Sequence, residues 1–468
     1  MNCLEFVKKV KSKEIDIVEH TENVIKECRK INKEYSYFNV ISEELALEQA
    51  EKIKKKPEGK LAGVAISVKD SICVKDVEST AGSRILKGYK PLFDATVIER
   101  IKKEGGIIIG KTAQDEFGFG GFSVNVGLGF DIPKNPFDKT RSTGGSSGGA
   151  AGVTQKLSFP HIALGESTGG SIACPASFCG VYGLCPSYGR VSRYGLIDFG
   201  NSLDKIGPIG KSAHDVALLL EVIAGHDKND FTTTEKKAEK YTESGKKPKF
   251  KLGVIKEAFG KGVDETVSNK VWDGIKKLES LGIKYEEISL PLAVKYGLAV
   301  YYLIATSEAS TNLAKYCGMR YGASDKLEGN FNEFFTKVRS HNFGEEAKRR
   351  IMLGTFARMA GYRDAYYLKA LKVRTKIIEE YKKAFKKFDL LISPTMPIVA
   401  PKISEVEKLS PLQNYIMDVL LVGPNIAGLP HLNIPVGFEN NLPVGMMLIG
   451  NHFDEANLLQ LGGAYEKR

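Results

Sequence analysis

Short apolar runs alternate along this chain with longer stretches in which apolar residues recur at helical spacing. The runs are apolar at nearly every position, as in 107-IIIG-110, which is typical of strands buried on both faces of a sheet. This alternation predicts an α/β sandwich, in which helices cover a large, mixed but mostly parallel central sheet. The predicted strands are 61–70, 107–110, 161–165, 388–394, 431–437 and 444–450, with two more starting at 251 and near 284.

Helical spacing is clear on both sides of these runs. The helix over 94–104 is predicted to start at an Asp cap, Asp94, and to stop before Gly105 and Gly106. The predicted helices are 14–35, 42–56, 94–104, 214–224, 265–281 and 454–466, and 292–386 is expected to be mostly helical.

No repeat or clear linker divides the chain. The polar residues 229–250 are expected to form an exposed loop. We therefore expect one domain over 1–468, with a core at about 50–230 and 385–468 and a mostly helical region at about 290–386.

Composition narrows the class of protein. No apolar run approaches the roughly eighteen residues that a membrane helix needs, and the first residues lack the apolar core of a signal peptide. Seven Cys in 468 residues favour a reducing compartment, so a cytoplasmic protein is expected. The spacing of Cys174, Cys179 and Cys185 fits no regular metal site, and no metal is expected. The net charge of +11 indicates a lysine-rich, solvated surface. The alternative is that this surface contacts an anionic partner such as RNA.

The stretch 142-STGGSSGGAAG-152 has the composition of a flexible linker, yet globular sequence flanks it. Its Gly-x-Ser-x-Gly pattern at 144–148 lacks the preceding strand that a nucleophile elbow requires. The Gly-x4-Gly-Lys-Thr pattern at 105–112 also fails as a phosphate-binding loop, because a helix precedes it and strand residues fill it.

Three motifs that are far apart in the sequence point to a catalytic function: 67-SVKD-70, 144-GGSSGG-149 and 168-TGGS-171. At this spacing they resemble the amidase signature family, which uses a Ser–cis-Ser–Lys triad. The resemblance implies that Ser171 is the nucleophile, that Ser146 relays its proton from an unusual cis peptide, and that Lys69 is the base. A serine hydroxyl is a poor nucleophile until a base takes its proton, and burial favours the neutral amine of a lysine.

The same resemblance implies an oxyanion hole. The backbone N–H groups of Thr168, Gly169, Gly170 and Ser171 are expected to converge on the developing negative charge. Losing one such donor typically costs about 3 kcal/mol of transition-state stabilisation.

Stretches in the second half are similar to one branch of the family, the glutamine-hydrolysing subunits of tRNA-dependent amidotransferases. They are 189–210, 308–322, 348–357 and 415–430. The resemblance implies that ammonia from glutamine passes to partner B and C subunits in a heterotrimer. The partner would bind ATP and Mg²⁺ and most of the Glu-tRNA(Gln), and this chain would hold no cofactor.

A glutamine site needs a cation for the α-carboxylate and an anion for the α-ammonium group. By the family pattern these are Arg350, with Arg349 as the alternative, and Asp418, which is predicted to lie in an otherwise apolar helix, MDVLLV, at 417–422. Tyr301 or Tyr302 matches a tyrosine near the substrate.

Two positions depart from the family text around the nucleophile. Ser167 stands where Asp is usual, and Ala173 where Arg is usual. We hypothesise the paired loss of a buried ion pair, so that restoring Asp alone at 167 should destabilise the fold more than restoring both. The loop 118-GFGGFSVN-125 also departs from the usual form. The alternatives are a free-standing amidase for a small amide and a low-activity structural subunit.

Overall fold

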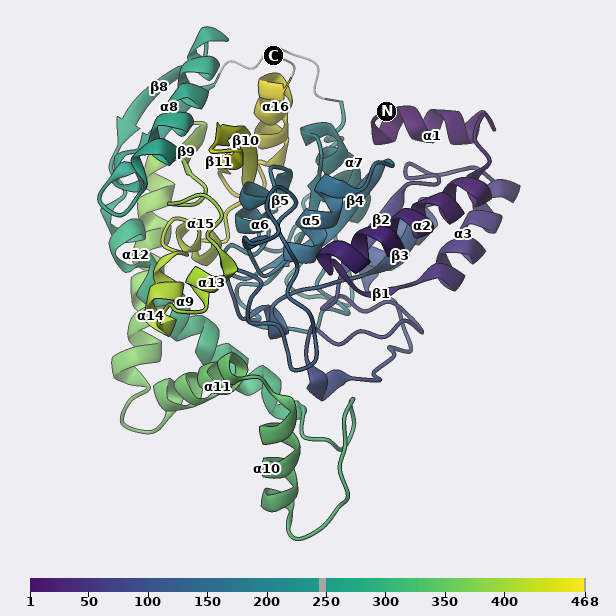
Figure 1. Ribbon diagram of the computed structural model, residues 1–468. Coiled ribbons are helices and arrows are strands. Elements are labelled where there is room, and N and C mark those ends of the chain that lie inside the picture. Colours follow the sequence, from purple (N-terminus) through teal and green to yellow (C-terminus); the bar gives the residue numbers. More distant parts are fainter. Residues whose placement is uncertain (244–249, 467–468) are drawn as a thin grey trace.

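The computed structural model of the protein describes residues 1–243 and 250–466 (Figure 1). Within them an eleven-stranded sheet has the order β1-β3-β2-β4-β6-β5-β10-β11-β9-β7-β8. The strands are β1 (Phe38–Ile41), β2 (Ala65–Lys69), β3 (Ile107–Thr112), β4 (His161–Ser167), β5 (Tyr182–Cys185), β6 (Lys205–Gly210), β7 (Lys251–Ile255), β8 (Lys284–Ile288), β9 (Leu390–Pro394), β10 (His431–Glu439) and β11 (Leu442–Gly450).

Helices cover this sheet. Helices α9 to α12 lie next to one another at one side of the molecule, and α10 projects from it (Figure 1). The α-helices of the described residues are α1 (Cys3–Lys11), α2 (Ile17–Tyr35), α3 (Glu43–Lys55), α4 (Thr96–Lys103), α5 (Gly148–Lys156), α6 (Ala173–Phe178), α7 (Ala213–Ile223), α8 (Glu265–Ser280), α9 (Pro291–Asn312), α10 (Phe331–Asn342), α11 (Glu345–Arg358), α12 (Lys369–Ala384), α13 (Ile403–Val406), α14 (Pro411–Ile416), α15 (Val422–Ile426) and α16 (Glu455–Glu466). None of these helices combines the length and apolarity needed to cross a membrane.

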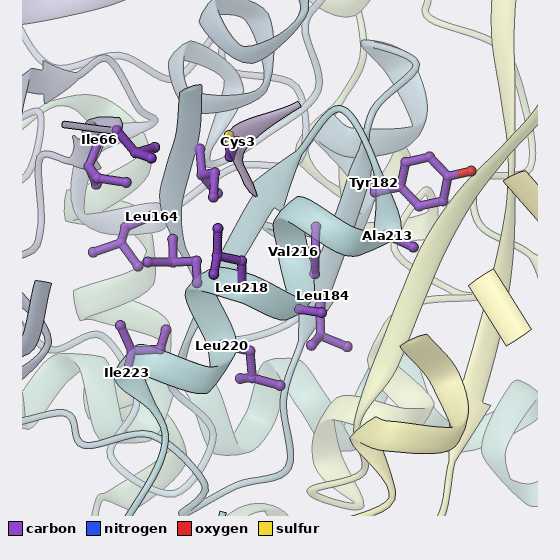
Figure 2. Close-up of a cluster of buried hydrophobic side chains, with 14 of the residues drawn as sticks. Cys3, Ile66, Leu164, Tyr182, Leu184, Ala213, Val216, Leu218, Leu220 and Ile223 are labelled. Carbon is purple, nitrogen blue, oxygen red and sulfur yellow. The ribbon is translucent and has the colours of Figure 1, made fainter. Parts of the chain in front are cut away.

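Two large apolar clusters lie on opposite faces of the sheet. Strand β11 shows this directly, because Met446 and Leu448 belong to one cluster and Met447 and Ile449 to the other. Successive side chains of a strand point to opposite faces, so this division places a core on each side. The first cluster contains residues of α7 together with residues of β2, β4 and β5 (Figure 2). The α/β sandwich predicted from the sequence is confirmed.

The sheet is mixed, as predicted, but it is not mostly parallel. Among the described residues, six of the ten neighbouring strand pairs are antiparallel. One cause is the β10–β11 hairpin, whose turn residues Asn440 and Asn441 both have positive φ. A parallel pair needs a crossover of a dozen or more residues, so this short connection dictates an antiparallel pair. Strands β5 and β6, which the sequence analysis missed, add further antiparallel pairs at the centre.

Most predicted elements lie where the apolar spacing placed them, with small corrections. Strand β1 and the short helices α1, α5, α6, α13 and α14 were not predicted. Helix α4 starts after Ala95 without a side-chain cap, because the carboxylate of Asp94 instead accepts hydrogen bonds from the backbone of Lys75 and from Lys102. The predicted loop 229–250 falls partly on 244–249, which lie outside the described residues.

Strands β2 and β4 are parallel neighbours, with Val68 opposite Leu164. Their carboxyl ends therefore open at the same edge of the sheet. Lys69 is the last residue of β2, and Thr168 to Ser171 follow β4 directly. This shared edge brings together motifs that are about a hundred residues apart in the sequence.

Candidate active site

Lys69 is completely buried at the end of β2, and three oxygen atoms surround its amine. Nζ lies 2.6 Å from Oγ of Ser146, 2.9 Å from the carbonyl oxygen of Glu166 and 2.9 Å from Oε2 of the same residue. Lysines at strand ends are usually solvated, and this one is not. The contact with Ser146 has the geometry that a base needs in order to take a hydroxyl proton.

The glycine-rich stretch 142–152 is a buried part of the core, and α5 begins inside it. A Cβ atom on Gly145 would lie 2.1 Å from Oδ2 of Asp115, and one on Gly149 would lie 2.5 Å from the backbone oxygen of Tyr37. The glycines therefore let neighbouring segments approach closely, which a linker would not require. The peptide bond between Gly145 and Ser146 is cis.

Ser171 is the least buried of the three predicted catalytic residues, with 7% of its surface exposed. Its carbonyl oxygen accepts a hydrogen bond of 3.2 Å from the backbone of Ser147, next to Ser146. Within the described residues, no hydrogen bond occupies the backbone N–H groups of Gly169, Gly170 or Ser171. Free N–H groups beside a serine hydroxyl form an arrangement that can bind an oxyanion.

Buried carboxylates surround this centre, and the sequence analysis did not single them out. Asp115 accepts hydrogen bonds from the backbones of Ser123 and Asn125, which ties the loop 118–125 to the site. Burial raises the pKa of Asp115 to about 6, although these hydrogen bonds and nearby Lys69 lower it. Glu166 contacts Lys69 directly. The signal in the sequence for Glu166 was an acidic residue within the predicted buried strand, which here reads HIALGES.

Arg350 lies inside the molecule, with 3% of its surface exposed, whereas 40% of the Arg349 side chain is exposed. Nε of Arg350 donates to Oε1 of Glu346 at 2.8 Å, and Tyr415 donates to the same oxygen. Burial opposes the charge of Arg350, but Tyr302 and Glu346 raise its pKa. The guanidinium also stacks on four aromatic rings, those of Phe119, Phe199, Tyr302 and Tyr415. The structure therefore places a permanent, buried cation here.

Asp418 lies beside this cation, in a turn between α14 and α15 rather than in the apolar helix that the sequence suggested. Tyr302 donates to its Oδ2 at 2.7 Å. Burial raises the pKa of Asp418 to about 6, while Tyr302 and Arg350 lower it. Tyr301 packs instead on Gly169, where a Cβ would lie 2.7 Å from the tyrosine ring. Both tyrosines therefore border the site, one at Asp418 and the other at the predicted oxyanion loop.

Ser167 and Ala173, the two residues that depart from the usual family sequence, have different surroundings. Ser167 is completely buried and is paired with Lys205 across β4 and β6. Ala173 packs in the apolar cluster that also contains Phe178 and Phe199. The cation nearest in register to position 167 is therefore Lys205, which the sequence analysis did not consider.

The motif at 105–112 has a structural role. The segment 105–112 contains strand β3, and Nζ of Lys111 lies 2.6 Å from Oγ of Ser79 and 3.2 Å from the backbone oxygen of Asp70. The described residues contain no group of three or more His, Cys, Asp or Glu side chains arranged to hold a metal ion.

Comparison with known proteins agrees with this geometry. The amidase family matches residues 19–459. The chain is 48% identical over 410 residues to a glutamyl-tRNA(Gln) amidotransferase subunit of Methanococcoides burtonii, covering 87% of this chain and 85% of that one. It is 44% identical over 474 residues to the protein of the same name from Carboxydothermus hydrogenoformans, covering 100% and 97%. The crystal structure of the protein of this name from Thermotoga maritima superposes with a TM-score of 0.81 at 35% identity, covering 100% of this chain and 94% of that chain.

Proposed function

The chain belongs to the amidase family, and from that premise we propose that it is the glutamine-hydrolysing subunit of a tRNA-dependent amidotransferase. It releases ammonia from glutamine, and the ammonia serves to convert Glu-tRNA(Gln) to Gln-tRNA(Gln) on a partner subunit. The observation that carries the proposal is the 2.6 Å contact between Nζ of Lys69 and Oγ of Ser146, beside a serine with free backbone donors.

The proposed reaction starts at Ser171. Its hydroxyl attacks the side-chain amide carbon of glutamine, while its proton moves through Ser146 to the neutral amine of Lys69. The backbone N–H groups of Gly169, Gly170 and Ser171, with Thr168 at the start of the loop, stabilise the oxyanion. The leaving nitrogen takes the proton and departs as ammonia, and water then hydrolyses the acyl-enzyme.

Arg350 and Asp418 orient the substrate in this proposal. The guanidinium of Arg350 keeps its terminal nitrogens available for the α-carboxylate, since Glu346 occupies its Nε. The carboxylate of Asp418 accepts the α-ammonium group, and Tyr302 holds it in place. Tyr301 packs on Gly169 of the oxyanion loop and contacts Tyr302.

The partners in this proposal are B and C subunits in a cytoplasmic heterotrimer. The partner supplies the ATP and Mg²⁺ site and most of the contact with Glu-tRNA(Gln), and this chain contributes no cofactor. The proposal is supported by the relatives that are named as subunits of glutamyl-tRNA(Gln) amidotransferase and that match nearly the whole chain.

Glutamine-dependent ammonia release tests the proposal, measured on the chain alone and with co-expressed partner subunits. We expect Ser171→Ala and Lys69→Met to reduce release by at least about a thousandfold while assembly with the partners is preserved. Ammonia release that persists in Ser171→Ala would contradict the assigned nucleophile. Fast turnover of simple amides by the isolated chain, insensitive to Arg350→Ala, would instead identify a free-standing amidase. No release from the wild-type complex would identify a structural subunit.

A further inference from the structure

The loop 168–171, which carries the proposed oxyanion hole, is held through the carbonyl oxygens of its two glycines. Nδ2 of Asn425 donates a hydrogen bond to the carbonyl oxygen of Gly169. The backbone N–H of Cys174, in α6, donates to the carbonyl oxygen of Gly170 at 2.8 Å. Both contacts reach the loop from outside it, and they use its acceptors while its donors stay available for a ligand.

These two contacts determine where the free N–H groups point. A peptide unit is planar, and in its trans form the C=O and N–H bonds point in opposite directions. The units that join Gly169 to Gly170 and Gly170 to Ser171 are both trans. Because the carbonyl of Gly169 is turned toward Asn425, the N–H of Gly170 faces away from Asn425. In the same way, the contact with Cys174 sets the direction of the N–H of Ser171.

The glycines of this loop provide space but no fixed orientation. Gly169 and Gly170 have no Cβ, so the peptide unit between them rotates more freely than one between other residues. Larger residues do not fit, because an added Cβ would lie 2.7 Å from the ring of Tyr301 at position 169 and 2.2 Å from the side chain of Leu421 at position 170. The orientation of this peptide unit therefore depends on a contact from outside the loop.

The side chain of Asn425 has the surroundings that such a contact requires. It is 1% exposed and lies in α15. The thiol of Cys185, which is a donor, lies 3.6 Å from its Oδ1. The NH2 end faces three acceptors, namely the carbonyl oxygen of Gly169, that of Leu421 at 3.2 Å and Nε2 of His431 at 3.4 Å. The amide therefore has one favourable orientation, with a hydrogen directed at Gly169.

We propose that Asn425 is a positioning residue for the oxyanion hole. It holds the carbonyl of Gly169 so that the N–H of Gly170 points at the oxyanion that forms when Ser171 attacks an amide. The side chain of Asn425 does not itself touch the substrate. This inference rests on the proposed function, because it concerns the same site and the same hydrolysis.

Asn425 also belongs to the segment that carries the proposed ammonium ligand, Asp418. The carbonyl of Asp418 accepts backbone hydrogen bonds from Leu421 at 2.9 Å and from Val422 at 3.1 Å, and the carbonyl of Leu421 accepts from Asn425. If Asn425 only stabilised this turn, its loss would weaken substrate binding and raise KM. A residue that orients the oxyanion hole acts in the transition state, so its loss lowers kcat and leaves KM nearly unchanged.

Asn425→Leu in the assembled complex is the first test, because leucine has a similar shape and no donor. We expect kcat for glutamine to fall about a hundredfold, as for a lost oxyanion donor, with KM within about threefold of the wild-type value. Asn433→Leu is the matched control. Asn433 is also completely buried, and its Nδ2 donates at 2.9 Å to the carbonyl oxygen of Val181, outside the oxyanion loop. Its kcat should stay within about threefold of the wild-type value.

Two kinetic results would overturn the inference. A raised KM with unchanged kcat in Asn425→Leu would assign the residue to the turn that carries Asp418. Values of kcat and KM both within about threefold of the wild type would show that the loop keeps its orientation without Asn425. Asn425→Ala repeats the measurement if the leucine variant does not fold, since alanine also removes the donor and leaves space instead of filling it.

The second test uses no glutamine and therefore separates this inference from the proposed function. An alkyl fluorophosphonate labels an activated serine: Oγ bonds to phosphorus, fluoride leaves, and the phosphoryl oxygen uses the same N–H donors. Labelling of Ser171, followed by intact mass, should be at least about tenfold slower in Asn425→Leu and unchanged in Asn433→Leu. Slower labelling supports the inference even if the wild-type protein hydrolyses no glutamine. Equal labelling rates of Asn425→Leu and the wild type would overturn it.

Discussion

Asp418 and Arg350 show how burial determines what a single residue can do. Both are buried, but aromatic rings and Glu346 surround the arginine, whereas the aspartate has one hydroxyl donor and the arginine as its main polar neighbours. The arginine therefore stays charged at every accessible pH, and the aspartate titrates near pH 6. Recognition of an α-ammonium group by Asp418 should consequently depend on pH.

We predict that KM for glutamine rises as the pH falls below about 6, because protonated Asp418 no longer attracts the α-ammonium group. Asp418→Asn should raise KM at pH 7.5 by about 10- to 100-fold, the equivalent of one charge-assisted hydrogen bond, and should abolish this pH dependence. The measurement is glutamine-dependent ammonia release from pH 5 to 8. Asp454→Asn is the control, since burial also raises the pKa of Asp454 to about 6. An unchanged pH dependence in Asp418→Asn would contradict the assignment.

The same shift predicts the direction of a stability effect. Because the pKa of Asp418 is higher in the folded than in the unfolded chain, its ionisation disfavours the folded state. Its contribution is lost progressively as the pH rises from about 4 to about 6. Compared with the wild type, Asp418→Asn should therefore gain more free energy of unfolding at pH 7 than at pH 4. The measurement is urea denaturation of both proteins at both pH values. A variant that is destabilised equally at both pH values would show that ionisation of Asp418 does not disfavour the folded state.

Position 167 has a cationic neighbour, and this changes the expectation that Asp alone at position 167 would destabilise the fold. Ser167 faces Lys205 in the register of β4 and β6, and burial lowers the pKa of Lys205. We now predict that Ser167→Asp alone changes the free energy of unfolding by less than about 1 kcal/mol, because Lys205 pairs with the new carboxylate. Adding Lys205→Met should cost about 3 kcal/mol by leaving that carboxylate buried and unpaired. A double-mutant cycle without coupling would exclude Lys205 as the partner.

At the scale of elements, α5 depends on glycine because of what lies beside it. Gly149 faces the backbone of Tyr37 and of Ala113, and backbone cannot move aside as a flexible side chain can. We predict that Gly149→Ala costs at least about 2 kcal/mol of unfolding free energy and lowers glutaminase activity, because α5 carries the serine loop. Gly463→Ala in α16 is the matched control, since no atom lies within 4 Å of its added Cβ.

That control should be neutral or should gain about 0.5–1 kcal/mol from the higher helix propensity of alanine. The measurement is chemical denaturation of both variants, with ammonia release in parallel. Equal stability of Gly149→Ala and Gly463→Ala would show that the serine loop tolerates more space than the contacts indicate.

At the scale of the whole molecule, the sheet joins parts of the chain that are far apart in sequence. Strand β5 pairs with β10, which connects residues 182–185 to residues 431–433. Neither of the two core segments predicted from the sequence, about 50–230 and 385–468, completes the sheet without the other. We therefore propose that 1–468 forms a single domain.

A single domain predicts one cooperative unfolding transition. Trp272, the only tryptophan of the chain, lies on α8 and contacts Phe259 and Tyr285 near the β7–β8 edge of the sheet. Its fluorescence should change at the same denaturant concentration as the far-ultraviolet circular dichroism of the whole chain. A fluorescence transition at clearly lower denaturant would mean that the β7–β8 edge unfolds as a separate unit.

The sequence by itself determined the α/β class and most strands and helices, and its resemblance to the amidase signature family pointed to Lys69, Ser146 and Ser171. These depend on local patterns, namely apolar periodicity and residue types at characteristic spacing. It missed β5 and β6, which are short, rich in Gly and Pro, and recognisable as strands only through their partners. It also overestimated the parallel share of the sheet, because strand direction depends on which strands become neighbours.

Only the tertiary structure showed that Arg350, and not Arg349, is buried. It also showed that Tyr302 contacts Asp418 while Tyr301 lies elsewhere. It brought Glu166 and Asp204 to either side of Thr168. The physical reason is that burial, hydrogen bonding and charge interactions depend on distances across the fold. A residue's type shows which chemistry it can perform, but its surroundings decide its charge, and neighbours from β2, β4, α9, α11 and the turn before α15 create those surroundings here.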